Sequence, residues 1–167
     1  ASKRQPTTPR PPENPAITAA AFAAIRPLPP TAEFLGLAAE LGIEFEPGDV
    51  DNLGRFLAIL LETNKTTNLT AITDPAQAWV KHIFDALTLL PVLASIEPAE
   101  GAKSLRIIDV GSGGGVPAFP LAILLPDTRF TLLEATGKKV DFLRAAAAAL
   151  GLKNIEVLQG RAETVAH

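Results

Sequence analysis

The sequence feature that most constrains the fold is a glycine-rich turn at residues 111–115, which lies between two apolar runs. The run before the turn predicts a buried strand, and the run after it predicts a helix. The alternation then repeats, with Glu134 at the end of the second strand and Gly151 after the second helix. The expected strands and helices lie at residues 105–110, 116–125, 129–134, 137–150 and 155–159. Strands that alternate with helices in this way are typical of an α/β fold with a doubly wound, parallel sheet.

The chain divides by composition into three parts. Residues 1–30 hold eight of the 15 prolines, and proline at that density predicts a mobile tail. Residues 31–100 carry apolar side chains at helical spacing and predict a helical N-terminal subdomain. Residues 101–167 hold three expected strands, whereas a doubly wound sheet is normally built from two such halves. We therefore expect residues 101–167 to be the N-terminal half of a domain whose C-terminal half is missing, and the chain to be a piece of a longer protein.

The glycine turn predicts a site for a cofactor that contains a nucleoside. Gly111, Gly113 and Gly115 let the backbone bend sharply and leave no side chain between it and a ligand. The amides of the turn and the N-terminus of the following helix offer hydrogen-bond donors and positive potential. Glu134 ends the next strand, where an acid can accept hydrogen bonds from ribose hydroxyls. The alternative is an ordinary tight turn that binds no ligand.

Asp109, which precedes the turn, favours a cationic cofactor. A carboxylate at this position would repel a pyrophosphate but would suit the sulfonium and amino groups of S-adenosylmethionine. The dinucleotide fingerprint G-x-G-x-x-G fails when it is counted from Gly111, because Val116 holds its last position. A nicotinamide-dependent Rossmann enzyme remains an alternative, since the count from Gly113 ends on Ala118 and passes weakly.

The composition argues against several other classes of protein. The chain has no cysteine and two histidines, so we expect no metal site. Its net charge of −3 gives no support to a protein that coats nucleic acid by bulk electrostatics. The longest apolar stretch, residues 116–125, is much shorter than the about 20 residues that a membrane span needs, so we expect no membrane partner.

Several motifs occur in the order typical of one enzyme family. Residues 64–75 read N-K-T-T-N-L-T-A-I-T-D-P, residues 81–86 read K-H-I-F-D-A, and residues 109–120 read D-V-G-S-G-G-G-V-P-A-F-P. Three further segments, L-L-E, G-K-K-V-D-F-L and G-R-A-E, lie at residues 132–134, 137–143 and 160–163. Over about residues 31–167 this ordered set resembles the bacterial 16S rRNA guanine-N7 methyltransferases, also called glucose-inhibited division protein B or ribosomal RNA small subunit methyltransferase G.

The resemblance implies a class I S-adenosylmethionine-dependent methyltransferase, whose Rossmann-like fold is present here as its first half. It implies methylation of N7 of a guanine in the 530 loop of 16S rRNA, with S-adenosyl-L-methionine as the cofactor. It also implies a cytoplasmic protein whose partner is 16S rRNA or the small ribosomal subunit, and we expect a monomer. By position, Gly111 and Val116 would line the cofactor, Glu134 would hold its ribose, and Ala162 and Glu163 would border its adenine.

Two of the three candidates for substrate contact lie outside any acid–base pattern. Lys138 opens a helix, where a cation opposes the helix dipole and indicates an anionic partner such as RNA. A solvated lysine is the alternative explanation. Asn68 lies in a loop with Asn64, and for both asparagines a bond to local backbone is at least as reasonable as a contact with substrate.

The third candidate, His82, lies on a helix that we expect to begin after Asp74 and to run to about Leu90. His82 and Asp85 resemble an acid–base pair. The alternative is a structural or substrate-positioning role, in which Lys81 and Asp85 form an ion pair on the helix surface. Guanine N7 has a lone pair and no proton, so its methylation requires no general base, and the catalytic residues stay unknown. For the function, a non-catalytic cofactor- or RNA-binding module is the remaining alternative.

Overall fold

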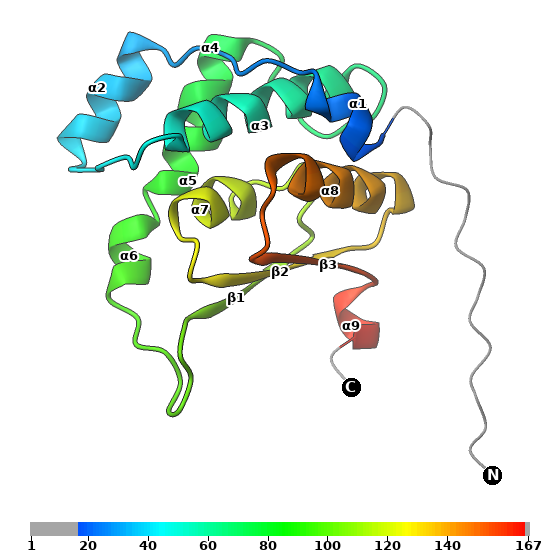
Figure 1. Cartoon of the computed structure of the whole chain (residues 1–167). Coiled ribbons are helices and arrows are strands. Elements are labelled where there is room, and N and C mark those ends of the chain that lie inside the picture. Colours follow the sequence, from blue (N-terminus) through cyan, green and yellow to red (C-terminus); the bar gives the residue numbers. More distant parts are fainter. Residues whose placement is uncertain (1–16, 166–167) are drawn as a thin grey trace.

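A computed structural model describes residues 17–165 and shows a three-stranded sheet covered on one face by helices (Figure 1). In chain order, the elements are α1 (Ala19–Ala23), α2 (Ala32–Glu40), α3 (Asp49–Asn64), α4 (Pro75–Ala78), the π-helix η1 (Trp79–Phe84), α5 (Asp85–Leu87), α6 (Leu90–Ala94), β1 (Arg106–Val110), α7 (Ala118–Leu124), β2 (Arg129–Glu134), α8 (Gly137–Leu150), β3 (Ile155–Gln159) and α9 (Ala162–Val165). No helix among residues 17–165 is both long enough and apolar enough to cross a bilayer.

The sheet is parallel and has the order β1-β2-β3. Its register pairs Ile107 with Phe130 and Phe130 with Ile155, so these three apolar side chains share the face toward the helices. The connecting helices α7 and α8 lie on this face, α1 and α3 lie beyond them, and α9 lies on the opposite side (Figure 1). The α/β fold with a parallel sheet, predicted from the alternating pattern, is confirmed.

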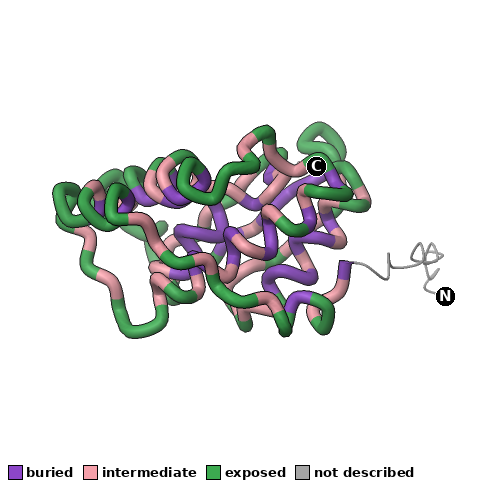
Figure 2. Tube along the Cα trace, turned by 90° about the horizontal axis from the view of Figure 1, so that it is seen from above, coloured by how far each residue is buried: buried purple, intermediate pink, exposed green. Residues whose placement is uncertain are grey.

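One apolar core joins the helical part of the chain to the sheet, and the buried residues gather at the centre of the trace (Figure 2). The rings of Phe56 in α3 and Phe119 in α7 stack with their centroids 4.9 Å apart. On the far side of α3, the rings of Trp79 and Phe34 lie 4.6 Å apart and attach η1 to α2. Aromatic contacts of this kind each add about 0.5–1.5 kcal/mol to the burial of the rings. The aromatic side chains therefore fix where α3 lies relative to the sheet.

The prediction of a mobile tail over residues 1–30 is wrong for residues 17–30, which pack on the rest of the fold. Residues 1–16 lie outside the described part of the chain. Ile17 and Phe22 are buried, with 4% and 3% of their surface exposed. The Phe22 ring meets Phe142 of α8 edge-on at 6.3 Å, and Leu28 N–H donates to the Gly54 carbonyl of α3 at 3.1 Å. The density of prolines hid this signal in the sequence. The segment docks because its apolar side chains pack on the core, namely those of Ile17, Phe22, Ile25 and Leu28.

The helix expected from Asp74 to about Leu90 begins as predicted but is not one regular helix. The Asp74 carboxylate accepts from Gln77 N–H at 2.8 Å, and Pro75 fills the first turn. From Trp79 the backbone is a π-helix, in which Asp85 N–H donates to the Val80 carbonyl five residues back. The extra residue in the turn rotates the side chains that follow, so spacing arguments based on 3.6 residues per turn fail here.

The second face of the sheet is open along β1. Ile108 and Val110 point away from α7 and α8 and have 59% and 57% of their surface exposed. Their neighbours in β2 on the same face are Thr131 and Leu133. An edge strand with exposed apolar side chains offers unpaired backbone groups and apolar area together.

Two helical glycines provide a test of the docking of the segment before α2. A methyl group on Gly54 of α3 would overlap the Leu28 carbonyl oxygen and lie 3.2 Å from the Trp79 ring, whereas one on Gly36 of α2 would meet nothing within 4 Å. We expect Gly54→Ala to lower the free energy of unfolding by about 1–3 kcal/mol. Gly36→Ala should raise it by about 0.5–1 kcal/mol, because alanine loses less backbone entropy in a helix. Urea unfolding of both variants measures the difference, and shifts of equal sign would contradict the docking.

Candidate functional site

The carboxyl ends of the three strands meet at one edge of the sheet, and the candidate site lies there. Gly111 N–H and Ser112 N–H both donate to the Leu133 carbonyl, at 2.7 and 3.2 Å. Gly160 N–H, which follows β3, donates to the Glu134 carbonyl at 3.0 Å. The chain thus leaves each strand beside its neighbour, which is where ligands bind in open α/β sheets.

The glycines of the turn serve two different purposes. Gly111, Gly113 and Gly115 all have positive φ angles, of 79°, 53° and 83°. A Cβ on Gly111 would meet nothing within 4 Å, and one on Gly113 would meet only the Gly111 carbonyl oxygen at 3.7 Å. A Cβ on Gly115 would lie 2.5 Å from the Phe119 ring. Gly111 and Gly113 therefore leave open space where a ligand could approach the backbone, whereas Gly115 allows α7 to pack closely.

Glu134 joins the end of β2 to the glycine turn. The residue is 8% exposed, and its carboxylate accepts from Gly113 N–H at 2.9 Å and from Thr136 N–H at 2.8 Å. Burial raises the pKa of Glu134, but the Thr136 and Gly113 amides, the Thr136 hydroxyl and the charge of Lys139 together outweigh it and lower the pKa below its usual range. The carboxylate is therefore ionised at neutral pH. The sequence predicted a ribose acceptor here, and the structure adds a second task, which is to hold the turn.

Asp109 carries the feature that best indicates a ligand. Its Oδ2 atom is buried and has no hydrogen-bond partner among the described residues. Burial raises the pKa of Asp109, and the nearby Ser112 hydroxyl offsets only part of this rise. An ionisable oxygen that is removed from water and left unpaired costs free energy unless a ligand compensates it. A cationic group beside the open part of the turn would do so, which fits the ammonium and sulfonium of S-adenosylmethionine.

The remaining predicted cofactor residues are placed around this edge. Val116 is half-buried between the turn and α7. Ala162 and Glu163 are exposed in α9, which begins just after Gly160. Nothing in the described contacts joins Ala162 or Glu163 to the turn, so their role at the adenine stays a prediction.

His82 lies in η1 and is held by a threonine. Its Nε2 atom lies 2.8 Å from Thr70 Oγ1. Burial lowers the pKa of His82, against the opposing effects of the Asp85 charge and the Lys81 backbone, so the ring is neutral at pH 7. No hydrogen bond joins His82 to Asp85 in the described structure. The expected ion pair between Lys81 and Asp85 is absent from the described structure as well, and Lys81 Nζ instead donates to Gln77 Oε1 at 3.4 Å.

The asparagines of the loop after α3 differ from each other. Asn64 bonds only to local backbone through the contacts described, whereas Asn68 is exposed and makes no side-chain hydrogen bond in the described structure. For each asparagine the sequence analysis left two roles open, a bond to local backbone and a contact with substrate. It missed Thr70, the partner of His82.

Lys138 is exposed at the start of α8. Within residues 17–165, no group of three or more His, Asp or Glu side chains is placed to hold a metal ion.

Comparison with known proteins points to one family. The family model described as rRNA small subunit methyltransferase G (GidB) matches residues 49–167. The ribosomal RNA small subunit methyltransferase G of Sorangium cellulosum is 47% identical over 137 residues, which cover 82% of this chain and 55% of that relative. The proteins of the same name from Ectopseudomonas mendocina and Neisseria gonorrhoeae are 42% and 45% identical over 79% and 78% of this chain, and each is covered to 58%. The chain thus spans little more than half the length of these relatives.

Replacing the Glu134 carboxylate tests its bonds to the turn. In Glu134→Gln, one of the two backbone N–H groups loses its acceptor and faces an amide NH₂. We expect the free energy of unfolding to fall by about 1–3 kcal/mol at pH 7.

The pH dependence of this difference follows from the lowered pKa of Glu134. Its stabilising effect is complete above the unfolded-state pKa of about 4.3 and is lost as the pH falls through the lower pKa of the folded state. The gap between wild type and Glu134→Gln should therefore be largest near pH 7 and narrow below about pH 4. Urea unfolding at about pH 7, 4 and 3 measures this difference, and a gap that stays constant down to about pH 3 would contradict the assignment.

Proposed function

Because this chain belongs to the rRNA small subunit methyltransferase G family, we propose that the protein is an S-adenosylmethionine-dependent methyltransferase acting on N7 of a guanine in the 530 loop of 16S rRNA. Within it, residues 101–167 form the first half of a class I methyltransferase domain, residues 31–100 form its helical subdomain, and the partner is 16S rRNA or the small subunit in the cytoplasm. We further propose that the protein is a monomer.

The observation that carries the cofactor assignment is the unpaired oxygen of Asp109 beside the open glycine turn. A dinucleotide would bring a pyrophosphate to this turn, and the half-buried carboxylate of Asp109 next to it would repel that group. An amino acid ammonium or a sulfonium would instead find a partner without competition from protein donors. The charge of the site therefore favours S-adenosylmethionine over a nicotinamide cofactor.

Three residues of this chain would hold the cofactor. Asp109 would accept from its ammonium, the backbone at Gly111 would approach it closely, and Glu134 would accept from its ribose hydroxyls. When bound, S-adenosylmethionine supplies an electrophilic methyl group on a positively charged sulfur. Because Glu134 is already ordered by Gly113 and Thr136, it would bind the ribose without a further loss of side-chain entropy.

Methylation of the RNA requires that guanine N7 is correctly positioned, and it requires no proton transfer. Guanine N7 has a free lone pair and no proton, so no side chain has to act as a general base. The lack of a hydrogen-bonded pair between His82 and Asp85 is compatible with this requirement. Orientation alone accounts for about 7–11 kcal/mol in well-aligned reactions. Lys138, His82 and Asn68 are proposed to orient the RNA, Lys138 through a phosphate and the others nearer the base.

Asp109→Asn tests the cofactor assignment and should separate stability from binding. At pH 7 the ionised Asp109 costs free energy, because its pKa is raised in the folded state; the penalty is complete above that pKa and vanishes as the pH falls below the unfolded-state value of about 3.9. We expect the variant to melt at a higher temperature than wild type at pH 7. Its affinity for S-adenosylmethionine should fall by about tenfold or more, the value of one charge-assisted contact.

The affinities of the complete gene product for S-adenosylmethionine, S-adenosylhomocysteine and NAD are measured by calorimetry. Unchanged affinity in Asp109→Asn, or tighter binding of NAD than of S-adenosylhomocysteine by wild type, would contradict the assignment.

The activity itself is tested with substrate. The complete gene product is incubated with methyl-labelled S-adenosylmethionine and with small ribosomal subunits that lack the modification. We expect label on N7 of one guanine in the 530 loop, and its absence would overturn the proposed function. Binding of the cofactor without transfer of label would point instead to a non-catalytic module.

A further inference from the structure

The loop that follows α3 is organised by one side chain. Asn64 Oδ1 accepts from Leu69 N–H at 2.8 Å and from Thr70 N–H at 2.9 Å, and its Nδ2 donates to the Thr70 carbonyl at 2.9 Å. Both lone pairs of the amide oxygen are therefore used, as is one of the two amide hydrogens. The side chain closes residues 64–70, hereafter the 64–70 loop, into a compact ring.

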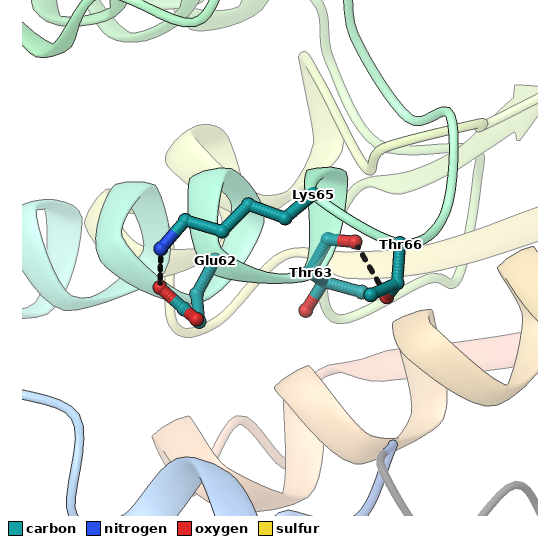
Figure 3. A network of polar contacts seen from close by, with 4 residues as sticks. All are labelled: Glu62, Thr63, Lys65 and Thr66. Atoms are coloured by element: carbon teal, nitrogen blue, oxygen red, sulfur yellow. Dashed lines mark hydrogen bonds and ion pairs between the residues drawn. The ribbon is translucent and has the colours of Figure 1, made fainter.

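The two ends of the 64–70 loop are anchored differently. At its start, the exposed side chain of Lys65 pairs with Glu62 at 2.6 Å, and Thr66 Oγ1 donates to the Thr63 carbonyl at 3.3 Å (Figure 3). At its end, Thr70 Oγ1 accepts from Ile72 N–H at 3.1 Å and lies 2.8 Å from His82 Nε2. The loop is thus tied through Thr70 to the π-helix that carries the proposed substrate residue.

The middle of the 64–70 loop lies against the cofactor turn. A Cβ built on Gly114 would be 3.3 Å from the Leu69 carbonyl oxygen, 3.5 Å from Leu69 Cβ and 3.0 Å from Leu60 Cδ1. A side chain at 114 would therefore fit only if Leu60 Cδ1 and the Leu69 carbonyl moved by a few tenths of an ångström. Leu69 follows directly on from the backbone that Asn64 holds, because its own N–H is one of the two that Asn64 accepts. A change in the 64–70 loop that moves Leu69 would therefore alter its contact with Gly114 of the glycine turn.

From these contacts we propose that Asn64 is a positioning residue for the cofactor turn, acting through Leu69 rather than by touching cofactor or RNA. Its amide holds the Leu69 backbone against Gly114, and this contact sets the position of Gly111 and Gly113, the two glycines that border open space. The inference rests on the proposed function for the identity of the cofactor, but the contact between loop and turn exists without it.

Asn64→Ala removes all three hydrogen bonds and should loosen the turn. In the unliganded complete gene product, we expect amide hydrogen exchange across residues 109–116 to become about tenfold faster or more. The affinity for S-adenosylhomocysteine, measured by calorimetry, should fall by about ten- to a hundredfold, because the donors and the acid of the site are no longer held in place.

Three comparison variants separate positioning from a loss of stability. Lys65→Ala removes only the exposed ion pair one residue away and should leave exchange and affinity within about twofold of wild type. Gly54→Ala, on the same helix, destabilises the fold without touching the loop, so at a similar loss of melting temperature it should keep the affinity. Asn64→Asp keeps both acceptor contacts and loses only the donor to Thr70, so it should restore most of the affinity that Asn64→Ala loses.

The outcomes are distinguishable from a failure of the proposed function. If wild type does not bind S-adenosylhomocysteine, the proposed function fails while the exchange measurement still tests the loop. If Asn64→Ala lowers the melting temperature yet leaves both exchange at 109–116 and affinity unchanged, or changes them no more than Gly54→Ala does, the positioning role is overturned. Should Asn64→Ala fail to fold, Asn64→Asp decides: we expect a severalfold weaker affinity than in Lys65→Ala, and equal affinities overturn the proposal.

Discussion

The hydrogen bonds that join the chain just beyond β1 and β2 hold the candidate site together. Gly111 and Ser112 donate to the Leu133 carbonyl, one residue before the end of β2, and Gly113 donates to the side chain of Glu134. Hydrogen bonding to β2 is thereby continued past the end of β1. Because each donor belongs to the turn and each acceptor to β2, the turn cannot move without breaking the pairing. A ligand at this edge meets a backbone that is already in place, which reduces the entropy lost on binding.

The fold places the two acids of this edge in environments that shift their pKa values in opposite directions. Glu134 is buried, each of its carboxylate oxygens accepts from a backbone amide, and its pKa is lowered. Asp109 is half-buried, its Oδ2 atom is buried and unpaired, and its pKa is raised. The first arrangement stabilises the folded chain, and the second weakens it. A protein that only needed a tight turn would gain stability by replacing Asp109 with an uncharged residue. An acid with an unpaired oxygen fits a site for a positively charged ligand, because the ligand would supply the missing partner.

Sequence patterns predicted the parts of the fold that depend on local periodicity. The strands at 129–134 and 155–159 and the helix at 137–150 have the predicted bounds, because each is a short apolar or amphipathic run between turn residues. Sequence patterns failed to predict the segments whose structure depends on long-range contacts. Residues 17–30 dock although prolines interrupt them, because Gly54 leaves room for the Leu28 carbonyl. The π-helix at Trp79–Phe84 has no local signature in the sequence, so the prediction of one regular helix from Asp74 to about Leu90 missed it.

The glycine turn shows why a motif can reveal that a site exists without revealing what each of its letters does. All of the glycines in the run from 111 to 115 look alike in the sequence, yet their missing side chains face different surroundings. Gly111 and Gly113 leave room for a ligand, Gly114 leaves room for Leu69, and Gly115 leaves room for Phe119. Leu69 belongs to the loop that follows α3, and Phe119 belongs to α7. Both elements pack on the turn from inside the protein. Protein therefore packs against two sides of the turn, at Gly114 and Gly115, and the open space at Gly111 and Gly113 is where we propose that the cofactor binds.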